Sequence, residues 1–209
     1  MIRSTLSRSI FIFLSLVLLS ACTKKEEGKK LSILVSPKGL EHAFWLTVKA
    51  GADSAGRELG VEIIWRGPAR ETDVPTQISI LEDYINKRVD AIVLAATDAK
   101  GIIPYVQKAL GARIPVITID SGVESDLPLS FIATDNVAAA RKAAQTLASL
   151  IGEKGEVACI PFVPGAATSV MREQGFREEI KNYPAIKLVA VQYSQSDVAT
   201  AMAVTEDIL

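Results

Sequence analysis

The sequence predicts an α/β protein in which helices cover both faces of a parallel β-sheet. From Leu31 onward, apolar runs of strand length alternate with amphipathic windows of helical length, which is the pattern of βαβ units. The composition agrees, because 49% of the 209 residues are hydrophobic and 22% are charged, as in folded proteins with a sizeable core. We therefore expect a globular α/β fold that follows an N-terminal segment of a different kind.

Residues 1–22 have the features of a secretory signal peptide. Arg3 and Arg8 precede the apolar run "SIFIFLSLVLL", which is too short to span a bilayer as a mature helix. The run ends in "LSAC", which resembles the lipobox of bacterial lipoproteins, in which the cysteine, here Cys22, is lipidated and becomes the new N-terminus. An ordinary signal peptide with an incidental cysteine is the alternative. The charged stretch "TKKEEGKK" at residues 23–30 predicts a tether.

The first set of elements contains four strand-like runs, "LSILVS", "VEIIW", "DAIVLAA" and "IPVITID". Amphipathic windows follow the first three runs and predict helices at about residues 43–59, 74–87 and 101–110. The stripe that the first helix should bury consists of Trp45, Val48, Ala52, Ala55 and Leu59. Asp98 is a candidate N-cap of the third helix.

The second set of elements is shorter. "LSFIATDN" leads into a predicted helix at about residues 137–151, "EVACIPF" into one at about 168–181, and "IKLVAVQ" into one from about residue 197. Cys159 lies in an apolar run, and we expect it to be a small buried hydrophobic residue. Two strands with at most a crossover strand, in roughly 75 residues, are fewer than a single core requires. We therefore expect the chain to be a truncated reading frame or a fragment.

Several classes of function lack their characteristic residues in this sequence. The 23 basic and 24 acidic residues form no sustained basic stripe, which argues against a nucleic-acid surface. His42 is the only histidine and no G-x-S-x-G turn occurs, so a catalytic triad and a zinc site both lack partners. A dinucleotide site needs the pattern G-x-G-x-x-G after the first strand, where this chain has Gly39 alone. No Walker sequence occurs either, so nucleotide sites lack their phosphate-binding loop. We predict a binding protein rather than an enzyme, with no cofactor and no metal.

Candidates for a ligand site follow the strand-like runs, because ligands of open α/β sheets bind outside the carboxyl ends of the strands. These positions hold His42, Phe44, Trp45, Arg66, Thr97, Asp98, Asp120 and Ser121. Aromatic rings can stack on the apolar C–H faces of a sugar, while carboxylates and an arginine bond its hydroxyls. The mixture therefore favours a small polar ligand such as a sugar.

Three of these candidates allow another interpretation. Trp45 fits the buried stripe of its helix, where a tryptophan belongs to the core more often than to a ligand site. Adjacent helical residues point about 100° apart, so one ring of the Phe44–Trp45 pair can serve the core while the other faces the ligand. Asp120 can cap a turn, and His42 can be a surface or capping residue.

Four stretches of the sequence are characteristic when taken together: "AFW" with "KAG" after it, "AIVLAATDAKGI", "IPVITIDS" with "FIATDN", and "GAATSVMREQGF". They resemble the type I periplasmic binding proteins of ABC sugar importers, the ribose-binding members in particular. Together they span the chain from about residue 31 to residue 209. The resemblance implies two doubly wound parallel-sheet lobes, residues 31–133 and an incomplete lobe at 134–209, which close on a sugar about a three-segment hinge.

The resemblance also implies roles by position. The residues that match the family's ligand contacts are His42, Phe44, Trp45, Asp120 and Arg172. His42 stands where the family has an amide-bearing residue, and Arg172 matches the arginine that reaches the ligand from the second lobe. The first hinge crossing falls at Thr134, Asp135 and Asn136.

Two ligand positions depart from the pattern of the ribose-binding members. Ser121 stands where they have an arginine, and Ser196 stands near the place of an aromatic residue of the second lobe. Both serines leave room for a larger ligand. A hexose, a cyclitol or another polyol therefore fits at least as well as ribose.

The function implied is that of a solute-binding lipoprotein, which carries a sugar or sugar-like polyol to the membrane permease of an ABC importer. We expect a monomer in the cell envelope, in the periplasm or at the outer cell surface, held by its lipid anchor. A receptor for a sensor kinase or chemoreceptor would use the same cleft, and the sequence does not separate the two. The effector domain of a transcription regulator shares the fold but should begin with a helix-turn-helix.

Overall fold

The computed structural model describes residues 29–40 and 42–209. The predicted signal peptide, Cys22 and most of the predicted tether lie outside the described residues. Residues Leu31–Leu209 form one compact unit. Within the described part of the chain, no helix combines the length and the apolar character that a membrane span requires.

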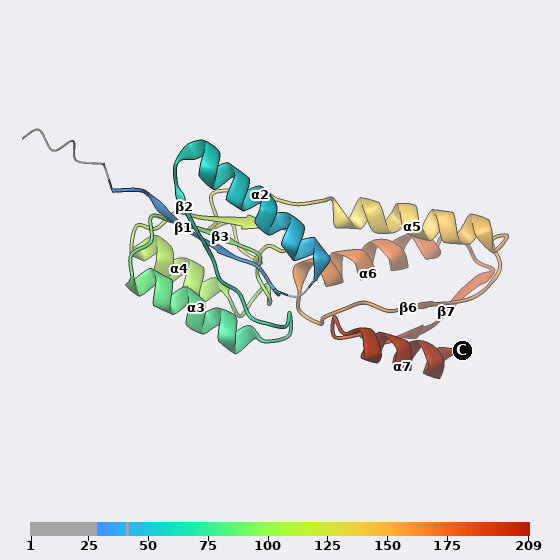
Figure 1. Ribbon diagram of the computed structural model, residues 1–209. Helices are drawn as coiled ribbons and strands as arrows, with labels where there is room; N and C mark the ends of the chain where they lie inside the picture. Colours follow the sequence, from blue (N-terminus) through green and yellow to red (C-terminus); the bar gives the residue numbers. More distant parts are fainter. Residues whose placement is uncertain (1–28, 41) are drawn as a thin grey trace, which may run out of the picture. The chain divides into compact units, whose positions relative to one another are not determined.

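The first sheet contains five parallel strands in the order β2-β1-β3-β4-β5. Its strands are β1 (Ser32–Ser36), β2 (Glu62–Trp65), β3 (Ala91–Leu94), β4 (Val116–Ile119) and β5 (Phe131–Ile132). The helices that alternate with them are α2 (Ala43–Leu59), α3 (Val74–Asn86) and α4 (Ile103–Gly111). Figure 1 shows this alternation along the chain, and the predicted α/β class with a parallel sheet is confirmed.

The two faces of the first sheet are covered unequally. On one face, Leu34, Ile92 and Val116 pack with residues of α3 and α4 in the main hydrophobic core. Strand residues alternate between faces, so their neighbours point to the opposite face, over which α2 lies. There Ile33 and Ile117 are half-buried. The sheet is thus fully covered by two helices on one face and partly covered on the other.

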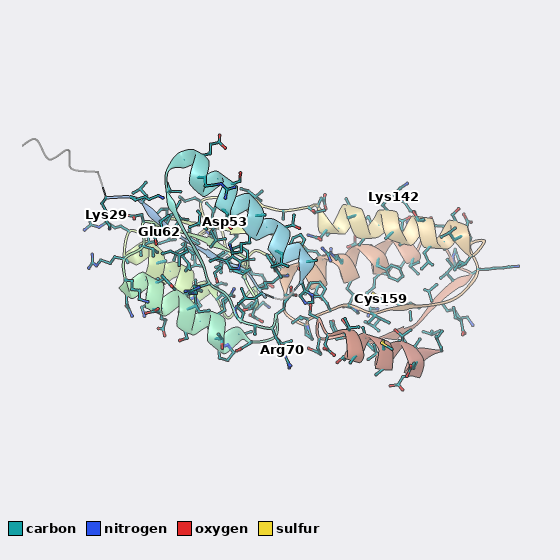
Figure 2. The ribbon with its side chains drawn as sticks, viewed as in Figure 1. Lys29, Asp53, Glu62, Arg70, Lys142 and Cys159 are labelled. Atoms are coloured by element: carbon teal, nitrogen blue, oxygen red, sulfur yellow. The ribbon has the colours of Figure 1, made fainter. Side chains whose placement is uncertain are left out.

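The second sheet consists of two parallel strands, β6 (Gly155–Cys159) and β7 (Ile186–Val191). Its helices are α5 (Asn136–Leu150), α6 (Ala167–Ile180) and α7 (Val198–Ile208). Figure 1 shows α7 on the opposite side of the two strands from α5 and α6. The core of this part joins Ala144 and Ala148 of α5 to Val157 and Ile180. Lys142 projects from the outer face of α5 (Figure 2).

Three local predictions differ from the structure. Ala55 is exposed and Leu59 is 70% exposed, because α2 turns the small Gly56 toward the sheet instead. Asp98 accepts hydrogen bonds from the backbone of residues 100 and 101 and so closes a turn, whereas α4 begins at Ile103 without a side-chain cap. Cys159 is half-buried rather than buried, although its burial still raises the pKa of the thiol.

Gln77 of α3 joins the carboxyl ends of β1 and β3. Its side chain is fully buried, and its amide nitrogen donates to the carbonyl oxygens of Pro37 at 3.1 Å and Ala95 at 2.9 Å. Its amide oxygen accepts from the backbone nitrogen of Thr97 at 2.9 Å and from the Thr97 hydroxyl at 2.8 Å. One side chain therefore satisfies backbone groups on both sides of the gap between these two strand ends.

We expect Gln77→Met to lower the free energy of unfolding by about 2–4 kcal/mol, because it keeps the volume but leaves buried backbone groups without partners. Urea denaturation followed by circular dichroism measures the change. Gln145→Met, at an exposed position of α5, is the matched control and should stay within about 0.5 kcal/mol of the wild type. Equal effects of the two substitutions would contradict a bridging role for Gln77.

The contact between α5 and α6 depends on Gly175. A Cβ atom at this position would overlap the carbonyl oxygen of Val137 and come within 3.0 Å of the Ala140 Cβ. Gly175→Ala should therefore lower the free energy of unfolding by about 1–3 kcal/mol. Gly51→Ala is the control, because a Cβ at that helical position meets nothing within 4 Å, and it should raise stability by up to about 1 kcal/mol. Thermal unfolding measures the stability of both variants, and we expect Tm to fall for Gly175→Ala and not for Gly51→Ala.

Candidate functional site

A pocket of about 430 Å³ lies at the carboxyl ends of strands from both sheets. Its lining residues are Lys38, His42, Ala43, Phe44, Trp45, Glu71, Asp120, Phe162, Thr168, Arg172 and Ser196. Six of the seven predicted ligand residues are among them. The exception is Ser121.

The strand order explains why residues so far apart in sequence meet here. The chain leaves β1 toward one side of the sheet and β3 toward the other, which opens a crevice outside their carboxyl ends. Lys38 to Trp45 follow β1, Glu71 follows β2 and Asp120 follows β4. Phe162 follows β6 and Ser196 follows β7, so the second sheet contributes its strand ends to the same pocket.

Lys38 is the most enclosed charged residue of the pocket, with 2% of its surface exposed. Its Nζ lies 3.1 Å from the Asp120 Oδ2 and donates to the Thr168 Oγ1, also at 3.1 Å. The ring of Phe162 is 4.9 Å from the same nitrogen, and that of Trp45 is 5.8 Å away. Lys38 is therefore the counter-ion of Asp120. The sequence did not reveal this pair, although Lys38 lies in the loop after β1, where we predicted ligand-binding residues.

Glu71 is the second carboxylate of the pocket and is 8% exposed. Its Oε1 accepts from the Trp45 Nε1 at 2.8 Å, and its Oε2 accepts from the Ser196 hydroxyl at 3.1 Å. The Nε2 of His42 is 3.4 Å from the same hydroxyl. A network of hydrogen bonds thus runs from the buried indole to Ser196 of the second sheet. Glu71 lies in the loop "GPARETD", but its position in the sequence did not mark it as a candidate ligand residue.

The two neighbouring aromatic residues divide their surfaces between core and pocket. Trp45 is 1% exposed, and its ring packs edge-on against Phe44, with centroids 4.9 Å apart and planes at 77°. Phe44 is 54% exposed. Both rings line the pocket, so Trp45 belongs to the core and to the pocket wall at once, and Phe44 offers the larger free ring surface.

Arg172 reaches the pocket from α6. Its Nε donates to the Oδ1 of Asn136 at 2.7 Å, and its guanidinium carbon lies 5.7 Å from the centre of the Phe162 ring. Asn136 begins α5, and Asp135 caps that helix by accepting from the backbone nitrogen of Ala138 at 2.9 Å. The predicted hinge crossing therefore lies between the end of β5 and the first turn of α5.

Ser121 lies behind the pocket wall, where it is fully buried. Asp120 has φ 55°, in the left-handed region, so the backbone turns sharply between Asp120 and Ser121. As a result, the side chain of Asp120 lines the pocket and that of Ser121 is buried in the protein interior. The geometry therefore gives no support to a ligand contact by Ser121. Thr97 is also buried, and its hydroxyl donates to the side chain of Gln77. Arg66 is exposed and donates to the carbonyl oxygen of Trp65. Neither residue lines the pocket.

The loop after β7 is also in an uncommon backbone conformation. Gln195 and Ser196 have φ 55° and 57°, so two consecutive residues other than glycine adopt the left-handed region. Asp197 follows them as the N-cap of α7, and the hydrogen bonds that it accepts from the backbone and side chain of Thr200 lower its pKa. Such conformations cluster at ligand sites, and here the turn presents Ser196 to Glu71.

The pocket can hold a small neutral molecule with hydroxyl groups. Besides His42, its ionisable residues are two cations, Lys38 and Arg172, and two carboxylates, Glu71 and Asp120. These opposite charges balance, while aromatic rings provide flat apolar surface. Among residues 29–40 and 42–209, no three His, Cys, Asp or Glu side chains gather as metal ligands would.

Similarity to known proteins extends over nearly all of the described chain. Residues 33–209 match the model of the Periplasmic binding protein domain. A ribose import binding protein of Bacillus subtilis is 28% identical over 96% of this chain and 68% of its own length. A D-ribose/D-allose-binding protein of Pseudomonas aeruginosa is 30% identical, over 94% of this chain and 66% of its own length.

Solved structures show the same likeness. A carbohydrate transporter solute binding protein from Agrobacterium radiobacter, in complex with D-arabinose, superposes with a TM-score of 0.83 at 35% identity. An ABC transporter solute binding protein from Agrobacterium vitis, with bound D-fucose, gives 0.82 at 38% identity. The match covers 86% and 85% of this chain, and it spans 63% of each of those chains. With residues 33–209 matching the domain model, this chain belongs to the periplasmic binding protein family.

Proposed function

We propose that this chain is the solute-binding component of an ABC importer, which binds a sugar or sugar-like polyol in the pocket and delivers it to a membrane permease without chemical change. Relatives named as ribose-binding and D-ribose/D-allose-binding proteins support this function. Structural neighbours that hold D-arabinose and D-fucose support the ligand class. The protein would act as a monomer in the cell envelope, with Cys22 as its lipid anchor, which the lipobox-like "LSAC" supports.

The observation that carries the proposal is the combination of aromatic rings and charge-balanced polar groups in one pocket. Phe44 offers a ring to an apolar sugar face, and Arg172 offers donors to hydroxyl oxygens. Asp120 keeps one oxygen for a hydroxyl while Lys38 compensates its charge. A ligand with a net charge would upset this balance, so a neutral polyol fits best.

Binding would take place between two lobes, residues 31–133 and 134–209, with Thr134, Asp135 and Asn136 as a hinge crossing. Hydrogen bonds already join the two sides of the pocket. Lys38 donates to Thr168, Ser196 donates to Glu71, and the backbone nitrogen of Ala99 donates to the carbonyl oxygen of Gly165 at 3.1 Å. A ligand that bonds to both sides would add to these contacts and favour the closed arrangement.

Thermal-shift measurements on the chain test the ligand class. We expect D-arabinose, D-fucose, D-ribose or D-allose to raise Tm in proportion to the logarithm of the sugar concentration, because the ligand binds only the folded state. A sugar acid and an amino acid serve as charged controls and should have no effect. A rise in Tm with an amino acid, and none with any sugar, would refute the proposed function.

A pair of variants separates ligand binding from folding. Asp120→Asn leaves the buried Lys38 ammonium without its counter-ion, so we expect a loss of about 2–3 kcal/mol in stability, less than for a fully buried pair, together with loss of the sugar response. The double variant Lys38→Met with Asp120→Asn removes both charges and should recover most of that stability. It should still not respond to sugar. A normal sugar response in the double variant would show that neither residue contacts the ligand.

A further inference from the structure

Asn136 holds the side chain of Arg172 through a buried hydrogen bond. Asn136 is 3% exposed, and its Oδ1 accepts from the Arg172 Nε at 2.7 Å. Its Nδ2 donates to the carbonyl oxygen of Thr134 at 3.0 Å. The amide is therefore bonded on both sides, to a pocket residue of α6 and to the segment that connects β5 with α5.

The chemistry of the two partners determines the orientation of this amide. A guanidinium nitrogen can only donate a hydrogen bond, and a backbone carbonyl oxygen can only accept one. The Asn136 side chain must therefore turn its oxygen to Arg172 and its nitrogen to Thr134. An aspartate would keep the bond to Arg172 and lose the bond to Thr134, and an alanine would lose both.

The bond at Nε constrains the part of Arg172 that faces the pocket. The guanidinium is planar, so a fixed Nε restricts the plane in which both terminal nitrogens lie. Within the described part of the chain, these terminal nitrogens form no side-chain hydrogen bond, and Arg172 lines the pocket. They are thus free to donate to a ligand from a restricted direction, which lowers the entropy lost when it binds.

We propose that Asn136 is a positioning residue for ligand binding, which orients the Arg172 guanidinium and ties it to the connection between the two sheets. The inference rests on the proposed function for its ligand. Because Asn136 is bonded to Thr134, a movement of that connection would carry Arg172 with it. The hydrogen bond between Arg172 and Asn136 would in this way couple ligand contact to the movement of the lobes.

The first arm of the test needs no ligand. In the 15N-labelled full chain, the Nε–H signal of Arg172 should exchange slowly with water because it donates to a buried acceptor. Asn136→Ala should abolish this protection, and Asn136→Asp should keep it. Ala144→Gly is the control on the same helix, because it opens the buried contact of α5 without touching Arg172 and should lower Tm with the signal unchanged.

The second arm measures sugar affinity by titration. Asn136→Ala should raise the Kd for the sugar that gives the largest Tm shift by about tenfold, the effect expected for a lost hydrogen bond to a charged group. Asn136→Asp should restore most of the affinity, and Ala144→Gly should leave it unchanged. In an Arg172→Lys background, which has no Nε to hold, Asn136→Ala should cause no further loss.

The outcomes separate this inference from the proposed function. If Asn136→Ala leaves the Arg172 signal protected, or weakens binding equally in the Arg172→Lys background, Asn136 does not act through Arg172 and the inference fails. If the wild-type chain binds none of the sugars, the proposed function fails, and the exchange of the Arg172 signal still decides whether Asn136 positions the guanidinium.

Discussion

The pocket depends on one buried amide, that of Gln77, which holds the carboxyl ends of β1 and β3 in a fixed relation. In a parallel sheet of this order, the chain departs from these two strands toward opposite sides, and the crevice between them must be open to admit a ligand. Backbone groups at an open crevice lose the partners that a continuous ladder would supply. Gln77 supplies those partners from α3, and the loop that carries Lys38 is thereby placed against Asp120.

The charges of the pocket are organised for recognition more than for stability. A buried ion pair such as Lys38 with Asp120 gains little net free energy, because each charge loses its hydration. Here the pair neutralises a carboxylate that remains 18% exposed and available to hydroxyl groups. Glu71 is compensated differently, by donors from Trp45 and Ser196 rather than by a cation. Both arrangements leave oriented acceptors in the pocket, which suits the neutral ligand that we propose.

Polar contacts also link the pocket to the parts of the chain around it. Arg172 is bonded to Asn136 at the start of α5, and Ser196 directly precedes the N-cap of α7. Both pocket residues thus lie beside the start of a helix, and α5 is held against α6 by the core that joins Ala144 to Ile180. The close approach of Gly175 to the carbonyl oxygen of Val137 sets the spacing of these two helices beside Asn136.

The order of helices and strands followed from sequence, because hydrophobic periodicity depends only on local spacing, and the expected first helix at residues 43–59 has the observed bounds. Phe44, Asp120 and Arg172 line the pocket, and the sequence could point to them because they occupy positions that the fold class or the family resemblance singles out. Which neighbour faces the pocket required the tertiary structure: the left-handed turn at Asp120 sends Ser121 inside. Lys38 and Glu71 were missed for the same reason, since loop residues acquire partners only when distant strand ends meet.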